Sequence, residues 1–291
     1  MECIRLRIKG CKKGSFTMSE AINTSKMPVL FIGHGSPMNL IEDNPWTKEW
    51  EALAKLTPRP KAILMISAHW YTAGSFVQVD EKPAMIYDMY GFPDPIYQLQ
   101  YPAETSKALI ERVQERLGAQ VAVKEDRGYD HGAYAPLLKM YPDAKIPVVQ
   151  LSVNYKADAR EWFAMGQALS VLRDEGVLIL GSGDIVHNLR LINPNMGNKG
   201  FPEAEAFEEA ILAKINPEKD NDLVGALKWE ALEGARVAAE SPDHLAPFYY
   251  CLGAVLGEGD VKELTLPPVD IHTHDYVWGS LSMTSLAWGL K

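Results

Sequence analysis

Short apolar runs alternate with segments of helical periodicity along most of this chain. The runs predict strands over Val29–Ile32, Ala62–Ser67, Phe76–Val79, Gln120–Val123, Pro147–Ser152 and Val177–Leu180. Apolar residues at three- and four-residue spacing predict helices over Trp46–Lys55, Thr105–Leu117, Ala133–Met140, Ala159–Asp174, Glu203–Lys214, Leu223–Ala239 and His244–Leu256. This alternation indicates an α/β fold, in which helices flank both faces of a largely parallel sheet.

Two breaks rich in Pro, Gly and Asn interrupt the alternation, at Glu81–Pro102 and Asn193–Pro202. The first is long and aromatic, which favours a pocket wall or a lid. A surface excursion held by its own tyrosines is an equally good interpretation. The chain has no internal repeat and no shift in composition, so we expect one domain over residues 27–291. The basic leader, residues 1–26, lacks the apolar core of a secretory signal and is expected to be a weakly ordered or disordered extension.

Charge and cysteine content exclude several classes of protein. The net charge of −9 argues against nucleic-acid binding and against an anionic membrane surface. No apolar stretch reaches the length of a membrane span. The three cysteines form no CxxC motif, which argues against a disulfide framework and favours a reducing cytoplasm. Any metal is therefore expected to have nitrogen and oxygen ligands.

Four histidines lie close to the ends of apolar or small-residue runs: His34, His69, His187 and His244. Three of them follow predicted strands, and strand ends are where open α/β sheets place their chemistry. Imidazole is also the commonest metal-binding side chain. The pattern therefore predicts a metal site at one rim of the sheet, although each histidine taken alone could be structural.

The residues around these histidines refine the prediction. In GHGSPMN, the glycines beside His34 permit a sharp turn, and the loop lacks the GxGxxG and GK[ST] patterns of phosphate sites. In GSGDIVHN, Asp184 is a candidate metal ligand or a partner of a metal-bound histidine. His187 is a candidate ligand or general base, because it lies further past its strand than the others.

The remaining histidines carry weaker signals. Before His244, Ser241 is a plausible helix cap, which places His244 in the first turn of an apolar helix. In GYDHG, Asp130 could orient His131, but a plain loop histidine is the alternative. We interpret His272 and His274, in DIHTHDY, as residues of a polar loop, because no apolar run leads to them. The absence of HExxH and GxSxG disfavours a zinc protease and a serine hydrolase.

Five motifs carry a family resemblance: GHGSPMN, SAHW, GYDHG, GSGDIVHNLR and SPDHLAPFYYCLGA. Together and in this order they resemble the class III extradiol ring-cleavage dioxygenases, in particular the 4,5-DOPA extradiol dioxygenase-like branch. The resemblance runs from about Met27 to the terminal GSLSMTSLAWG. It implies a catalytic domain over residues 27–291, a single α/β domain around a mixed sheet, that uses O2 to open a catechol ring.

The resemblance also implies roles for individual residues. His34, His69 and His244 match the ligands of one divalent metal, His187 an acid/base that is a possible fourth ligand, and His131 a second catalytic histidine. The protocatechuate branch has a carboxylate where this chain has His244. The resemblance implies Fe(II) for activity, whereas an all-histidine set also suits Zn(II). A zinc-dependent hydrolase or a non-enzymatic metal-binding protein thus remain alternatives, and the catechol, the cleavage position and the oligomeric state stay open.

Overall fold

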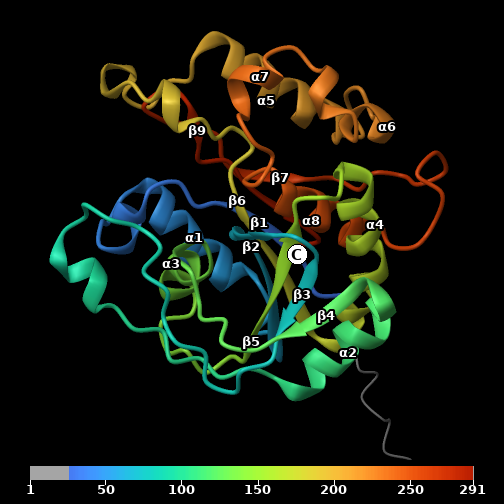
Figure 1. Ribbon diagram of the computed structural model, residues 1–291. Helices are drawn as coiled ribbons and strands as arrows, with labels where there is room; N and C mark the ends of the chain where they lie inside the picture. The colour runs from blue at the N-terminus through green and yellow to red at the C-terminus, as the bar shows by residue number, and fades with distance from the viewer. Residues whose placement is uncertain (1–25, 291) are drawn as a thin grey trace, which may run out of the picture.

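A twisted eight-stranded sheet forms the centre of the protein (Figure 1). The computed structural model describes residues 26–290, so the predicted extension lies outside the described residues apart from Lys26. The strand order is β4-β3-β5-β2-β6-β1-β10-β7. These strands are β1 (Val29–Gly33), β2 (Ala62–Thr72), β3 (Ser75–Gln78), β4 (Val121–Lys124), β5 (Val148–Asn154), β6 (Val177–Gly183), β7 (Asp270–Thr273) and β10 (Ser285–Trp288). A separate hairpin pairs β8 (Tyr276–Val277) with β9 (Leu281–Ser282).

The four central strands, β5, β2, β6 and β1, run parallel to one another. Beyond them, β3 is antiparallel to β5 and β10 is antiparallel to β1, so the sheet is mixed. The central strands are the ones with continuous apolar runs, and they are buried along almost their whole length. The predicted α/β fold, a single domain with a mixed and largely parallel sheet, is confirmed.

Helices cover both faces of the sheet because successive strand residues point to opposite sides. Leu30 and Ile32 pack with the helices on one face, α1 and α3, whereas Val29 and Phe31 pack with those on the other, α2, α4 and α8. Figure 1 shows these two layers, with α5, α6 and α7 forming a cap above the sheet. The helices are α1 (Pro45–Leu56), α2 (Lys107–Leu117), α3 (His131–Met140), α4 (Ala159–Leu169), α5 (Pro202–Lys214), α6 (Leu223–Ala226), α7 (Ala235–Ala238) and α8 (Ala246–Leu256).

The prediction of one helix over Leu223–Ala239 is wrong. The segment forms α6, a 3-10 turn at Trp229–Ala231 and α7. Leu232 is extended and Gly234 adopts a left-handed conformation with φ 77°, which breaks the helical path between the turns. The predicted helix over Ala159–Asp174 also changes to a 3-10 helix at Ser170.

The C-terminal strands were not predicted, because they are short and β7 is largely exposed at the edge of the sheet. The prediction of a polar loop at His272 is therefore wrong, since this residue lies within β7, whereas His274 follows that strand. β10 is buried against β1, so the last residues of the domain complete the core beside the first strand.

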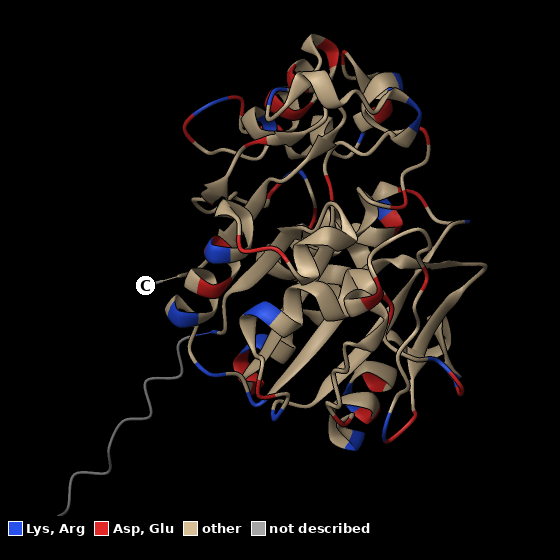
Figure 2. Ribbon diagram, turned by 90° about the vertical axis from the view of Figure 1, so that its left-hand side faces the viewer, with Lys and Arg blue, Asp and Glu red and all other residues tan. Residues whose placement is uncertain are grey.

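The surface carries both signs of charge. In the view of Figure 2, basic and acidic residues are interspersed along the outer helices and loops. This side of the protein has no continuous basic face, in agreement with the net negative charge of the chain. Within residues 26–290, none of the helices combines the length and the apolar character that crossing a membrane requires.

Candidate metal centre

The end of β1 brings His34 into the interior. His34 follows Gly33 directly and is 1% exposed. The chain then turns at Gly35, which adopts the positive φ of 55° that the flanking glycines predicted. Asp184 Oδ1 accepts a hydrogen bond from Gly35 N at 3.1 Å, and Asn39 donates to His34 O at 2.9 Å. The turn is therefore held from two sides, and the imidazole has a defined position.

His69 lies within β2 rather than beyond its end. The predicted strand ended at Ser67, but β2 continues to Thr72. Its pairing with β6 stops at Ser67, and its register with β5 shifts between Ile66 and Tyr71. Such irregularities re-aim side chains, and here the irregular stretch carries His69 at the rim of the sheet.

His244 precedes α8 instead of lying in its first turn. Ser241 does not cap the helix, so that prediction is wrong: its hydroxyl donates to Asp243 at 3.0 Å, and α8 begins at Ala246 with a proline in its first turn. The carbonyl of His244 accepts a hydrogen bond from Asp184 N at 3.0 Å. This bond joins the end of β6 to the start of α8 and fixes His244, which is 5% exposed.

Five histidines of the sequence analysis gather in one cluster: His34, His69, His131, His187 and His244. The ring centroids of His34, His69 and His244 lie 5.0–5.2 Å apart. His131 lies 3.8 Å from His69 by the same measure. The ring of His187 stacks on His244 with centroids 3.4 Å apart and planes 3° apart.

The other two histidines lie outside this cluster. His272 pairs with Glu49 at 2.7 Å, and His274 lies 3.5 Å from the buried carboxylate of Glu208. The structure therefore separates the two histidines of DIHTHDY from the other five. Among those five, the interpretation of His131 as a loop residue is wrong, because His131 is the first residue of α3.

Hydrogen bonds define which ring nitrogens are free in His34 and His69. Ser182 donates its hydroxyl proton to Gly132 O at 2.5 Å, so at 3.0 Å it accepts a proton from His34 Nδ1. Asp88 Oδ2 lies 3.2 Å from His69 Nδ1 and, as a carboxylate, accepts the proton there. Both Nε2 atoms therefore carry lone pairs, and they face each other at 3.1 Å.

This arrangement fits a divalent metal. Two nitrogens bound at about 2.1 Å to one ion lie roughly 3.0–3.4 Å apart, whereas two bare lone pairs at this distance repel each other. Neither ring nitrogen of His244 has a hydrogen-bond partner within residues 26–290, although Nδ1 lies 3.2 Å from Asp243 without suitable geometry. Asp184 Oδ2 is likewise buried without a partner among these residues. The cluster thus offers several donor atoms that a cation would satisfy.

Ligand atoms within 4.8 Å of one another form three overlapping groups. One contains His34, His69 and His131, a second contains His34, Asp184 and His244, and a third combines His187, Asp243 and His244. His34 thus belongs to the groups of both His131 and His244. The geometry brings His131 as close to His34 and His69 as a ligand would be, a role that the sequence analysis did not assign to it.

Burial favours the neutral form of four of these histidines. Desolvation lowers the pKa of His34 and His244 well below the ordinary value, and the neighbouring histidines add to this effect. Desolvation also lowers the pKa of His131, and it lowers that of His187 to about 4. Conversely, burial raises the pKa of Asp184 well above its ordinary value. Neutral imidazoles are the form that binds metals.

One site residue was missed by the sequence analysis, and one partner was wrong. Asp130 does not orient His131: it caps α3 through Ala133 N and accepts a 2.6 Å hydrogen bond from Ser67. The partner of His131 is Asp88, whose Oδ1 lies 2.9 Å from Nδ1. Burial alone would raise the pKa of Asp88, but hydrogen bonds from His131 and His69 lower it below the ordinary value. Its signal in the sequence is a lone carboxylate within the apolar, aromatic stretch MIYDMY.

An α/β sheet with a cluster of histidines at its rim defines a protein with a candidate metal centre. Residues 28–273 match the family described as the catalytic LigB subunit of aromatic ring-opening dioxygenase. The chain belongs to this family and is an extradiol ring-cleaving dioxygenase.

Individual relatives agree with this assignment. The chain is 41% identical over 274 residues to a protein of Escherichia coli K12 named 4,5-DOPA dioxygenase extradiol, which covers 92% of this chain and 97% of the relative. A protein of the same name from Beta vulgaris is 39% identical, covering 80% of this chain and 88% of the relative. The crystal structure of an uncharacterized protein from Escherichia coli K12 superposes with a TM-score of 0.74 at 38% identity, covering 90% of this chain and 99% of that chain.

Proposed function

We propose that the protein uses Fe(II) and O2 to open the ring of a DOPA-like catechol, with His34, His69 and His244 as the metal ligands. The observation that carries this proposal is the 3.1 Å contact between the lone pairs of His34 Nε2 and His69 Nε2, beside the ring nitrogens of His244, which have no hydrogen-bond partner within residues 26–290. The names of the relatives support the choice of substrate. We propose the reducing cytoplasm as the compartment, on the ground that the three cysteines form no CxxC motif.

When bound, the metal would lower the pKa of the catechol hydroxyls and activate O2. The protein's own residues hold the ligands, exclude water and move protons. The orientation of the His187 ring favours an acid/base role over a role as fourth ligand, because the ring is parallel to that of His244. Each imidazole lone pair lies in its ring plane, and two parallel planes share no point at which one ion could lie in both planes. His131, on the His69 side of the cluster, is the second candidate for proton transfer.

The proposal is tested by loading the metal-free protein with Fe(II) under anaerobic conditions and then adding O2 with a panel of catechols. We expect a yellow open-ring chromophore, consumption of O2 and the largest kcat/KM for DOPA-like compounds. The proposal is contradicted if no catechol is turned over by protein with a verified Fe(II) content.

The same experiment separates the alternative of a zinc-dependent hydrolase. Zinc has no accessible second oxidation state, so a zinc hydrolase would act without O2 and would retain activity after Zn(II) loading. We expect the Zn(II)-loaded protein to be inactive towards catechols and to recover activity only after exchange to Fe(II).

Replacement of His187 by alanine is expected to lower turnover by about 10²–10⁴-fold, the usual contribution of a positioned acid or base. The metal content should remain near that of the wild type, because the proposed ligands are unchanged. Metal analysis and steady-state kinetics on the same Fe(II)-loaded sample check both parts. His272→Ala, which removes a histidine outside the cluster, is the matched control. Loss of the metal in His187→Ala would instead make His187 a ligand.

A further inference from the structure

One carboxylate enters the histidine cluster from outside the predicted motifs. Asp88 belongs to the segment Glu81–Pro102, whose composition is compatible with a pocket wall or lid and with a surface excursion. Its Oδ1 accepts hydrogen bonds from His131 N at 3.0 Å and from His131 Nδ1 at 2.9 Å. Its Oδ2 lies 3.2 Å from His69 Nδ1. The two oxygens of a single carboxylate therefore contact two different imidazoles, Oδ1 that of His131 and Oδ2 that of His69.

The backbone sets this position. Tyr129 N donates to Ala84 O, and Ile86 N donates to Tyr129 O, each at 2.7 Å, which makes a short parallel ladder between the two segments. The residues paired in this ladder are Met85 and Tyr129; Asp88 follows Met85 by three residues and His131 follows Tyr129 by two. The ladder therefore holds the two segments side by side just before Asp88 and His131.

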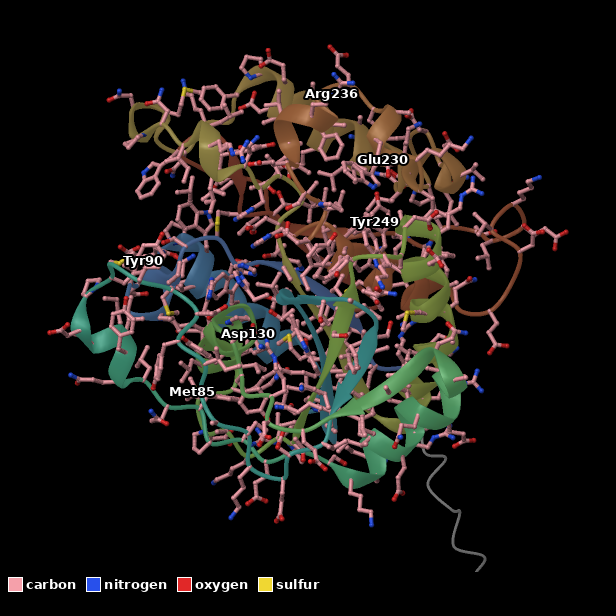
Figure 3. All side chains as sticks on the ribbon, viewed as in Figure 1. Met85, Tyr90, Asp130, Glu230, Arg236 and Tyr249 are labelled. Carbon is pink, nitrogen blue, oxygen red and sulfur yellow. The ribbon has the colours of Figure 1, made fainter. Side chains whose placement is uncertain are left out.

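The ladder itself depends on a glycine. A Cβ atom on Gly128 would lie 2.3 Å from the carbonyl oxygen of Ala84, so only glycine permits this close approach of the two backbones. Tyr87 adds a second attachment by donating its hydroxyl proton to Leu99 O at 2.8 Å within the same segment. In Figure 3, Met85 and Asp130 mark the two segments in the lower body of the protein, and Tyr90 marks the outer end of the Asp88 stretch.

We propose that Asp88 is a positioning residue that holds His69 and His131 together in the tautomer with a proton on Nδ1. An ionised carboxylate only accepts hydrogen bonds, so each imidazole must place its proton on the nitrogen that faces Asp88. The Nε2 atoms of both rings are then free, one towards the metal and one towards the reacting groups. Carboxylates that accept from metal-bound histidines orient the ring and raise its basicity. The inference deepens the proposed function, because it relies on His69 as a ligand and His131 as a proton carrier.

Asparagine cannot take over this role. Its amide has one acceptor oxygen and one donor nitrogen, so it can accept a proton from only one of the two imidazoles. The other imidazole then faces an N–H group and must change its tautomer or move away. Glutamate keeps two acceptor oxygens on a longer side chain. Comparison of Asp88→Asn with Asp88→Glu therefore shows whether two acceptor oxygens are required at this position or whether any polar side chain is enough.

The test uses full-length protein with ¹⁵N-labelled histidine, in the metal-free and Zn(II)-loaded forms. Imidazole ¹⁵N shifts and two-bond couplings report which ring nitrogen carries the proton. We expect Nδ1–H tautomers for His69 and His131 in the wild type and loss of at least one of them in Asp88→Asn. Zn(II) affinity, measured by chelator competition, should fall about 10–100-fold in Asp88→Asn and recover in part in Asp88→Glu.

Asp94→Asn, an exposed substitution in the same segment, is the matched control and should change neither readout. Thermal unfolding of each variant shows whether it is folded. Should Asp88→Asn not fold, Asp88→Glu decides, since it must keep both Nδ1–H tautomers. Unchanged tautomers and unchanged Zn(II) affinity in Asp88→Asn would overturn the proposal. A wild-type protein that fails to turn over catechols would overturn the proposed function but leave these readouts of Asp88 intact.

Discussion

His34→Ala is expected to abolish stoichiometric metal binding and, with it, ring-cleaving activity. Loss of a residue that merely supports a metal-bound histidine weakens affinity about 10–100-fold, so loss of a ligand should exceed about 100-fold. His34 is a proposed ligand with contacts at both ring nitrogens: Ser182 lies 3.0 Å from its Nδ1, and His69 Nε2 lies 3.1 Å from its Nε2. Metal content after Fe(II) loading and gel filtration, together with turnover of a DOPA-like catechol, measures the effect.

One control variant and one pair of variants make this prediction specific to the proposed ligands. His272→Ala removes a histidine that pairs with Glu49 outside the cluster and should keep full metal content. His244→Ala should lose the metal, whereas His131→Ala should keep it and lose turnover. The last pair matters because His131 lies in the same close group as His34 and His69. Retention of the metal by His34→Ala would contradict the proposed centre, and a reversed outcome for His244 and His131 would exchange their roles.

The stability of the metal-free protein is expected to fall steeply as the pH decreases below about 6.5. Burial lowers the pKa of His34, His131, His187 and His244 in the folded state, so the unfolded chain binds more protons in this range. Protonation therefore favours unfolding, and each such histidine contributes about 1 kcal/mol per pH unit between pH 6.5 and 5.5, rising to about 1.4 at lower pH.

Other titrating groups modify the slope. Asp184, whose pKa is raised by burial, is protonated in the folded state while its unfolded counterpart is ionised, which offsets about one histidine. His274, with a pKa raised by Glu208, acts in the same opposing sense, but above pH 6.5. Asp88, with a lowered pKa, is ionised in both states over this range. The net expectation is a loss of about 2–4 kcal/mol per pH unit between pH 6.5 and 5.5.

Urea unfolding of the metal-free protein at pH 7.5, 6.5 and 5.5 measures this slope. His244→Gln, which removes one of the buried imidazoles, should reduce it by about 1 kcal/mol per pH unit between pH 6.5 and 5.5. A free energy of unfolding that stays constant from pH 6.5 to 5.5 would show that the buried histidines titrate as they do in the unfolded chain.

The sequence was sufficient for the parts of the protein that depend on local pattern. The continuous apolar runs around Leu64 and Ile179 predicted central strands, and both lie in the buried parallel core. The histidines that follow such runs were found for the same reason, because a strand end is a local feature. Their grouping into one cluster then followed from the rule that parallel strands end at one edge.

What the sequence could not supply depends on pairing between distant segments. Asp88 reaches His131 through a ladder with Tyr129, and no periodicity in MIYDMY announces that ladder. The short strand β7 is mostly exposed and therefore lacks an apolar run. The break in the helix predicted over Leu223–Ala239 depends on a left-handed Gly234, which a helical pattern tolerates in sequence.

The residues that contact His34 lie far from it in the sequence, and this separation determines when a metal could bind during synthesis. Ser182, which sets the tautomer of His34, is 148 residues away in sequence, and His244 lies 210 residues (244 − 34) beyond His34. A growing chain that has emerged only as far as α3 already displays His34, His69 and His131, but it lacks the hydroxyl that orients the first of them. With His34 and His244 as proposed ligands, a metal would be fully bound only after α8 has been synthesised, and it would then link the end of β1 to the start of α8.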